Sequence, residues 1–76
     1  MRTQIQTTQP TEGVVQYSVS SPDSPLVLVI RVEEDFEQRV RVSYSTGKPV
    51  FKAAAICFPE NTQLHIARLL ETYFAA

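Results

Sequence analysis

The sequence is poor in the residues that carry most enzyme and metal chemistry. Its 76 residues include one cysteine (Cys57), one histidine (His65), two glycines and no tryptophan. A single cysteine excludes an internal disulfide, so we expect a reducing compartment, the cytoplasm. Two glycines are too few for a glycine-rich phosphate loop. These absences predict that the chain is not an enzyme and that it binds no cofactor.

Long hydrophobic stretches are absent as well. The longest apolar run covers residues 26–30, whereas a helix that spans a bilayer needs ~20 apolar residues. Residues 1–13 contain no apolar segment of the length found in signal peptides. We therefore expect no association with membranes and no secretion leader.

Metal and catalytic motifs are not found at the few positions that could supply them. There is no C-x-x-C or H-x-x-x-H motif, and the acidic residues at 33–37 lack the glycine and the ligand spacing of a calcium loop. His65 falls on the polar side of a predicted helix, where we expect it to be solvated. Cys57 lies in an apolar strand, where a lone thiol packs as a small hydrophobic group. We predict neither a metal site nor a catalytic centre.

The composition is that of one small globular domain. Hydrophobic residues make up 43% of the chain and charged residues 20%, which is typical of a chain that folds. Residues 1–13 are rich in Thr and Gln and show no sustained periodicity, so we expect a flexible N-terminal arm. Residues 14–76 are predicted to form a single α+β domain.

Apolar and polar residues alternate in the way that strands require. The alternation predicts strands that begin near residues 14, 26 and 39, and β-branched and aromatic residues predict a fourth strand over 50–58. Residues 59–76 place an apolar stripe at helical spacing, formed by Ile66, Leu69, Leu70, Tyr73 and Phe74. The predicted fold is α+β, a four-stranded antiparallel sheet with one C-terminal helix packed on one face.

The charge changes sign abruptly along the middle of the chain. Residues 12–37 carry six acids and one arginine, a balance of −5, and residues 38–58 carry four cations and no acid, a balance of +4. We interpret the acids of residues 33–37 as the solvated tip of a hairpin and the following arginines as a separate feature. Arg31 is expected to meet Arg39 or Arg41 across neighbouring strands.

Two surfaces are candidates for function. The first is a basic sheet face that could hold a nucleic-acid backbone, and its candidate residues are Arg31, Arg39, Arg41 and Lys52. Of the aromatic residues that could stack on bases there, Tyr17 and Tyr44 fall on the strand faces assigned to the core, and Phe51 remains. Because the net charge is −1, we rank nucleic-acid binding second.

The second surface is apolar and would contact protein. Its candidate residues are Val27, Val29, Leu64 and Phe74. A strand that is apolar on both faces and a leucine outside the helix stripe indicate contact with a second subunit or a larger complex. We therefore expect a small interaction module that binds a protein partner and forms a homodimer. A decoy that mimics phosphates with the acids of residues 33–37 is a third reading, for which four acids are too few.

The order of elements over residues 26–74 resembles one known family. The segment ICFPENTQLHIARLLETYF, which leads from a strand through a proline into a helix, is similar in outline to the small single-stranded-DNA-binding transcriptional coactivators. The resemblance implies four strands and a helix, a dimer, and binding of single-stranded DNA. The lysine-rich loops and sheet aromatics of that family are not matched, so the resemblance implies no site residues here.

Overall fold

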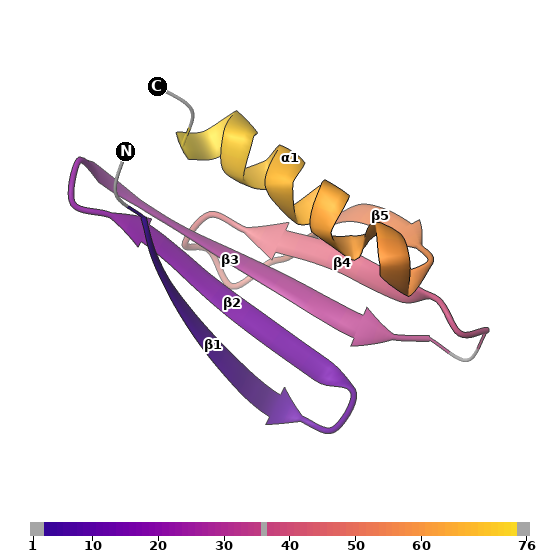
Figure 1. Cartoon of the computed structure of the whole chain (residues 1–76). Coiled ribbons are helices and arrows are strands. Elements are labelled where there is room, and N and C mark those ends of the chain that lie inside the picture. Colours follow the sequence, from indigo (N-terminus) through magenta and orange to yellow (C-terminus); the bar gives the residue numbers. More distant parts are fainter. Residues whose placement is uncertain (1–2, 36, 75–76) are drawn as a thin grey trace.

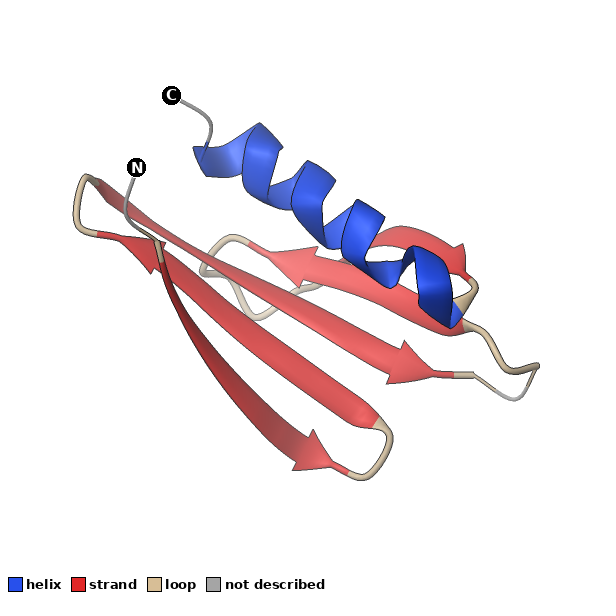
Figure 2. Ribbon diagram, in the orientation of Figure 1, coloured by secondary structure: helices blue, strands red, loops and turns tan. Residues whose placement is uncertain are grey.

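The computed structural model describes residues 3–35 and 37–74, which form a five-stranded sheet and a C-terminal helix (Figure 1). The elements are β1 (Gln4–Thr11), β2 (Val14–Ser21), β3 (Ser24–Glu34), β4 (Val40–Ser45), β5 (Lys52–Cys57), a 3-10 turn (Pro59–Asn61) and α1 (Thr62–Phe74). Each strand pairs antiparallel with its neighbour in the chain, in the order β1-β2-β3-β4-β5. The helix lies on one face of the sheet (Figure 2). The predicted α+β class and C-terminal helix are confirmed.

The predicted number of strands is wrong, because the sheet has five strands and not four. The additional strand is β1, which forms within the segment that we expected to be an arm. It pairs with β2 from Gln4↔Ser20 to Thr8↔Gln16. Ile5 is the only large apolar residue in β1, so this strand lacks the apolar alternation by which the others were found. Its threonines favour extended backbone, and its partner strand supplies the hydrogen bonds.

Short turns connect the strands and fix their register. Gly13, in the β1–β2 turn, has a φ of +80°, a conformation that glycine adopts without steric cost. Its carbonyl oxygen accepts a hydrogen bond from the Glu34 N–H at 3.0 Å, which ties this turn to the end of β3. In the β3–β4 turn, the Asp35 N–H donates to the Arg39 carbonyl oxygen at 2.7 Å. Asp35 therefore lies in a hairpin turn, as predicted, whereas Glu33 and Glu34 belong to the end of β3 and pair with β4.

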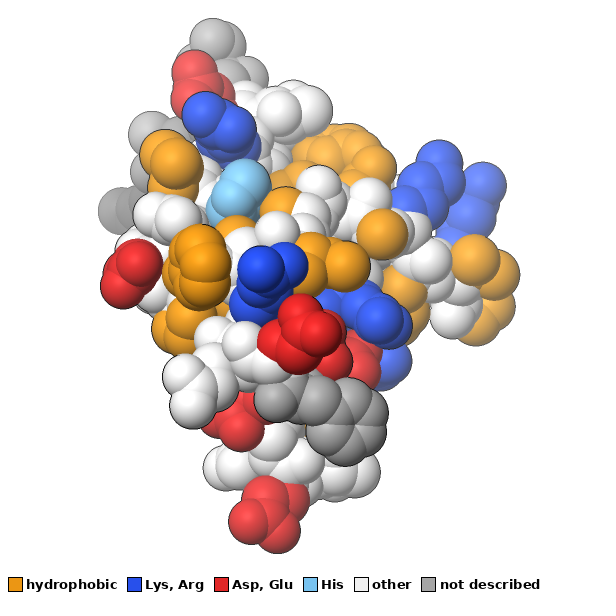
Figure 3. Space-filling model, turned by 90° about the vertical axis from the view of Figure 1, so that its right-hand side faces the viewer, with side chains coloured by type: hydrophobic (Ala, Val, Ile, Leu, Met, Phe, Trp, Pro, Cys, Tyr) orange, Lys and Arg blue, Asp and Glu red, His pale blue; other side chains and the backbone are white. Residues whose placement is uncertain are grey.

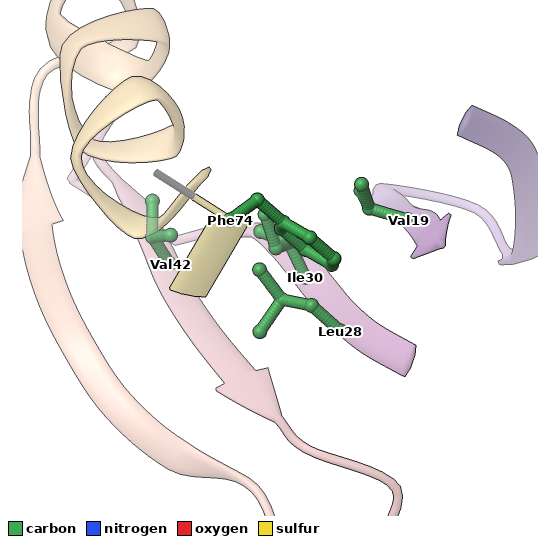
Figure 4. Packing of buried hydrophobic residues seen from close by; sticks show 5 residues of the cluster. All are labelled: Val19, Leu28, Ile30, Val42 and Phe74. Atoms are coloured by element: carbon green, nitrogen blue, oxygen red, sulfur yellow. The ribbon is translucent and has the colours of Figure 1, made fainter. Parts of the chain in front are cut away.

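The core lies between the sheet and the helix. Its buried residues are Val19, Leu28, Ile30, Val42 and Phe74, which converge from β2, β3, β4 and the last turn of α1 (Figure 4). Burying an aliphatic or aromatic side chain of this size stabilises a fold by about 1.5–3 kcal/mol. The even-numbered positions of β3 face the helix, in agreement with the predicted alternation.

The helix covers only part of this face. Pro59 stands at the first position of the 3-10 turn, where its missing N–H costs nothing, and the predicted stripe of α1 packs against the core. The backbone of α1 comes closest to β4 and β5. A hollow of about 160 Å³ remains between α1 and the β1–β2 side of the sheet. Its lining is apolar apart from one glutamine: Ile5, Tyr17, Val19, Ile30, Gln63, Ile66 and Leu70.

Candidate interaction face of the sheet

The sheet face opposite α1 carries most of the candidate residues, and we call it the open face. Residues that are directly paired across two strands point to the same side of a sheet. Since Ile30 and Val42 point toward the helix, their neighbours along β3 and β4 point away from it. The open face is built from Val27, Val29, Arg31, Glu33, Arg41, Ser43, Ala53 and Ile56, with Phe51, Arg39 and Phe58 at its margin.

Arg31 occupies the middle of the open face and is held by two neighbours. Its Nη2 donates a hydrogen bond to Oε1 of Gln16, which is its register partner in β2, at 3.2 Å. Its guanidinium carbon lies 4.2 Å from the centre of the Phe51 ring, a distance at which the ring attracts a cation. Its Nε is buried and has no hydrogen-bond partner among the described residues. The guanidinium is therefore positioned and still holds an unused donor.

Arg39 forms a second pair with an aromatic ring at the margin. Its guanidinium carbon lies 5.3 Å from the centre of the Phe58 ring, and both side chains are exposed. Arg39 also contributes to a hollow of about 340 Å³ at the β3–β4 turn. Two acids line the same hollow, whose complete lining is Glu34, Asp35, Gln38, Arg39, Val40 and Pro59.

The acids and the arginines are neighbours in space, so our interpretation of them as separate features is wrong. Glu33 is paired directly with Arg41 across β3 and β4. Arg31 is paired with Ser43 on β4 and with Gln16 on β2, so it does not face another arginine across a strand pair. The opposite charges of the two sequence segments therefore meet along one hairpin. Figure 3, which views the end of the molecule at the β3–β4 turn, shows basic, acidic and hydrophobic side chains interspersed.

Lys52 does not belong to the arginine face. It is paired with Tyr44, whose ring packs toward the helix against Tyr73 at a centroid distance of 5.8 Å. The cause is a bulge in β5: Val42 pairs with Ala55 and Ser43 with Ala53, which leaves Ala54 as an extra residue. An extra residue reverses the side to which all preceding residues of a strand point. Lys52 is therefore turned to the helix side and Phe51 to the open face.

The four apolar candidates are divided among three places. Val27 and Val29 lie on the open face, where Val27 is 43% exposed. Leu64 is 52% exposed on the helix, on the other side of the sheet. Phe74 is 5% exposed and belongs to the core. Its assignment to an interaction surface is wrong, because the last turn of α1 folds its ring against β3.

Sequence reasoning missed two apolar residues of the open face. Ile56 is 58% exposed and Phe58 is 52% exposed, both near β5. Ile56 is the register partner of Arg41. The signal was available, since residues 56 and 58 alternate with the half-buried Cys57. These two residues were missed because the prediction for residues 50–58 named a strand but did not say which residues face each side of the sheet.

The remaining polar groups do not gather into a site. Cys57 is a free thiol that packs against the core, and His65 lies half-buried on α1. Within residues 3–35 and 37–74, no three His, Cys, Asp or Glu side chains are placed so as to hold a metal ion. A side-chain hydrogen bond with Tyr44, followed by desolvation, raises the pKa of Tyr73 above its ordinary value of 10.0.

Comparison with known proteins adds no relative to this picture. No family model, no curated protein and no solved structure matches the chain. The resemblance to the coactivators therefore rests on the order of elements alone, and the fifth strand departs from it. In the described part of the chain, no helix is both long enough and apolar enough to cross a membrane.

Proposed function

We propose that the chain is a small non-catalytic interaction module, a homodimeric subunit that binds a protein partner through its open face. The observation that carries the proposal is the composition of this face. Two arginines are stacked on phenylalanines, Arg31 on Phe51 and Arg39 on Phe58, and Ile56, the register partner of Arg41, is exposed on the same face. Arginine and aromatic residues are the types most enriched where protein interfaces derive their binding energy.

Pre-organisation of Arg31 supports this proposal. An arginine that is already held by Gln16 and Phe51 loses less side-chain entropy on binding than a solvated one. The pairing of Glu33 with Arg41 offsets one positive charge of this face, which favours a partner of mixed charge over a polyanion.

The exposed area also supports a partner. The accessible surface of the chain is 5535 Å², whereas a monomeric protein of 8.6 kDa is expected to expose ~4,700 Å². The excess is about 800 Å², which equals the area that each partner contributes to a standard interface.

The single free thiol fits a cytoplasmic, reducing environment.

Binding of single-stranded nucleic acid is the second candidate. The stacked arginines and phenylalanines favour it, because aromatic rings and guanidinium groups are the platforms on which unpaired bases stack. The acids beside Arg39 and Arg41 oppose it by repelling phosphates. Under this reading, Arg39→Ala combined with Arg41→Ala should weaken binding of a fluorescent oligonucleotide and flatten its salt dependence.

One substitution separates the two candidates. Ile56→Lys places a charge in the apolar part of the open face, next to Arg41. It should abolish capture of a protein partner, and it should strengthen capture of nucleic acid because it adds a cation. Leu64→Lys is the matched control, since Leu64 is similarly exposed on the other side of the sheet.

The measurement is affinity capture from a native lysate with and without nuclease, followed by binding of the identified partner in purified form. We expect a nuclease-resistant partner that binds the wild type and Leu64→Lys but not Ile56→Lys. Nuclease-sensitive capture that increases with Ile56→Lys would replace the first candidate by the second. A purified partner that binds Ile56→Lys as tightly as the wild type would remove the open face as the binding surface.

A further inference from the structure

The edge strand β1 is unusually open to pairing. It borders the sheet and is paired with β2 alone in the described part of the chain, and all eight of its residues are exposed. An edge strand presents unpaired N–H and C=O groups along its free side, and proteins protect such an edge with charges, prolines and bulges. Gln4–Thr11 contains no charged residue. From Gln4 to Thr8 its register is regular, and in β1 the proline, Pro10, and the irregularity both lie after Thr8.

The other edge of the sheet is better protected. Strand β5 carries the exposed Lys52, and its register is interrupted by the bulge at Ala54. Bulges and lysines are the usual devices that prevent edge pairing. The two edges of the sheet are therefore not equivalent, and β1 is the edge that can pair with a further strand.

We propose that this strand is β1 of a second copy of the chain, paired antiparallel about Gln6. This inference deepens the homodimer part of the proposed function by naming its surface. Antiparallel pairing centred on Gln6 sets each Gln6 opposite its symmetry mate, Ile5 opposite Thr7, and Gln4 opposite Thr8. This register uses the whole regular segment and stops before Pro10, which has no N–H to donate.

The side chains of β1 are self-complementary in this arrangement. The absence of charge means that no like charges meet across the two-fold axis, and amide and hydroxyl side chains can form hydrogen bonds across the strands. Ile5, which is 52% exposed on the helix side, is covered by the partner strand. The axis stands perpendicular to the sheet, so both helices lie on one side of a ten-stranded sheet.

The dimer leaves the open face free. Both open faces point to the side of the combined sheet opposite the helices, so pairing through β1 does not compete with a partner at Ile56. A variant can therefore lose dimer formation and still bind the partner, or lose partner binding and still form the dimer.

Opposite charges at position 6 test the register. Gln6→Lys and Gln6→Glu each place like charges directly opposite one another in the dimer, which should raise the dimer dissociation constant about fivefold. An equimolar mixture of the two variants should restore wild-type affinity or better, because lysine then faces glutamate. The matched control is Ala54→Lys, which adds the same charge to the exposed position on the β5 edge and should leave the dissociation constant unchanged.

Sedimentation equilibrium of the full chain gives these constants, and circular dichroism verifies that each variant is folded. Amide exchange above and below the dissociation constant gives a second readout, in which the outward N–H groups of Gln4–Thr8 gain protection only in the dimer. A monomeric wild type would overturn the inference, as would a dimer insensitive to both position-6 variants or one disrupted by Ala54→Lys. Capture of the partner through Ile56 is measured separately, so its loss or retention does not decide this result.

Discussion

The environment of an individual side chain in this domain is set by the residue that it contacts on another element. Tyr73 is an example: its ring lies 5.8 Å from that of Tyr44, and the hydrogen bond between the two side chains favours the neutral phenol. Nothing in the spacing of residues 44 and 73 indicates this contact, because one belongs to a strand and the other to the helix.

The raised pKa of Tyr73 has a consequence for stability at high pH. Below pH 10 the tyrosine is neutral in the folded and unfolded states, and its contribution is fully present. Above that pH the unfolded chain loses the proton first, so the contribution is lost as pH rises through the folded pKa. We expect Tyr44→Phe to lower the pKa of Tyr73 toward its ordinary value.

Ultraviolet titration of tyrosinate in the folded protein measures this change, with Tyr17→Phe as the control. If Tyr44→Phe and Tyr17→Phe gave the same titration curve for the remaining tyrosines, the contact between Tyr44 and Tyr73 would be absent in solution.

Phe74 provides a second test at this scale. Because its ring is buried in the core, Phe74→Ala should lower the free energy of unfolding by about 3 kcal/mol. Leu64→Ala, on the exposed side of the same helix, should change it by less than about 0.5 kcal/mol. Urea denaturation measures both values, and equal losses would show that the helix is rotated from the orientation described.

At the scale of elements, the β3–β4 hairpin brings the two charged segments together. Glu33 and Arg41 are paired on the open face, and cross-strand pairs of opposite charge contribute roughly 0.2–1 kcal/mol. The pair lies near the solvent, so salt should weaken it.

A double-mutant cycle with Glu33→Gln and Arg41→Gln measures this coupling. We expect a coupling energy of about 0.5 kcal/mol at low salt that is reduced in 1 M salt, where charges are screened within ~3 Å. Pairing Glu33→Gln with Arg31→Gln gives the control, since Arg31 is paired with Ser43 instead. A larger coupling in the control would mean that the register of the hairpin is shifted.

The elements were predictable from sequence where side chains alternate by polarity. Apolar and polar residues alternate clearly in β2, β3 and β4, so the sheet faces of Tyr17, Ile30 and Tyr44 were predicted correctly. The apolar stripe of α1 was equally clear at helical spacing. Strand β1 was missed because its backbone pairing leaves no apolar pattern in a Thr- and Gln-rich segment. The direction of Lys52 was not predictable, because one extra residue in a run of three alanines leaves no trace in the composition.

At the scale of the whole molecule, the main feature is that the sheet is wider than the helix α1 that packs on it. The single helix of the described residues packs mainly on β4 and β5, so a hollow remains beside β1 and β2 and the opposite face of the sheet has no helix on it (Figure 1). The chain extends over 39 × 22 × 19 Å, and it exposes more surface than its mass requires. The location of this surplus depends on which strands the helix covers.

In the dimer proposed above, we expect the bulge at Ala54 to determine where assembly stops. A dimer joined at β1 carries a β5 strand at each end, and a sheet whose ends also accepted strands would grow without limit into a filament. Deleting Ala54 removes the extra residue, keeps Lys52 and Ile56 on their present sides, and straightens the terminal edge. We expect the deletion variant to form long polymers, visible by electron microscopy and rising light scattering, where the wild type stays a closed particle. If the deletion variant remained as small as the wild type, termination would lie elsewhere, with Lys52 as the remaining barrier.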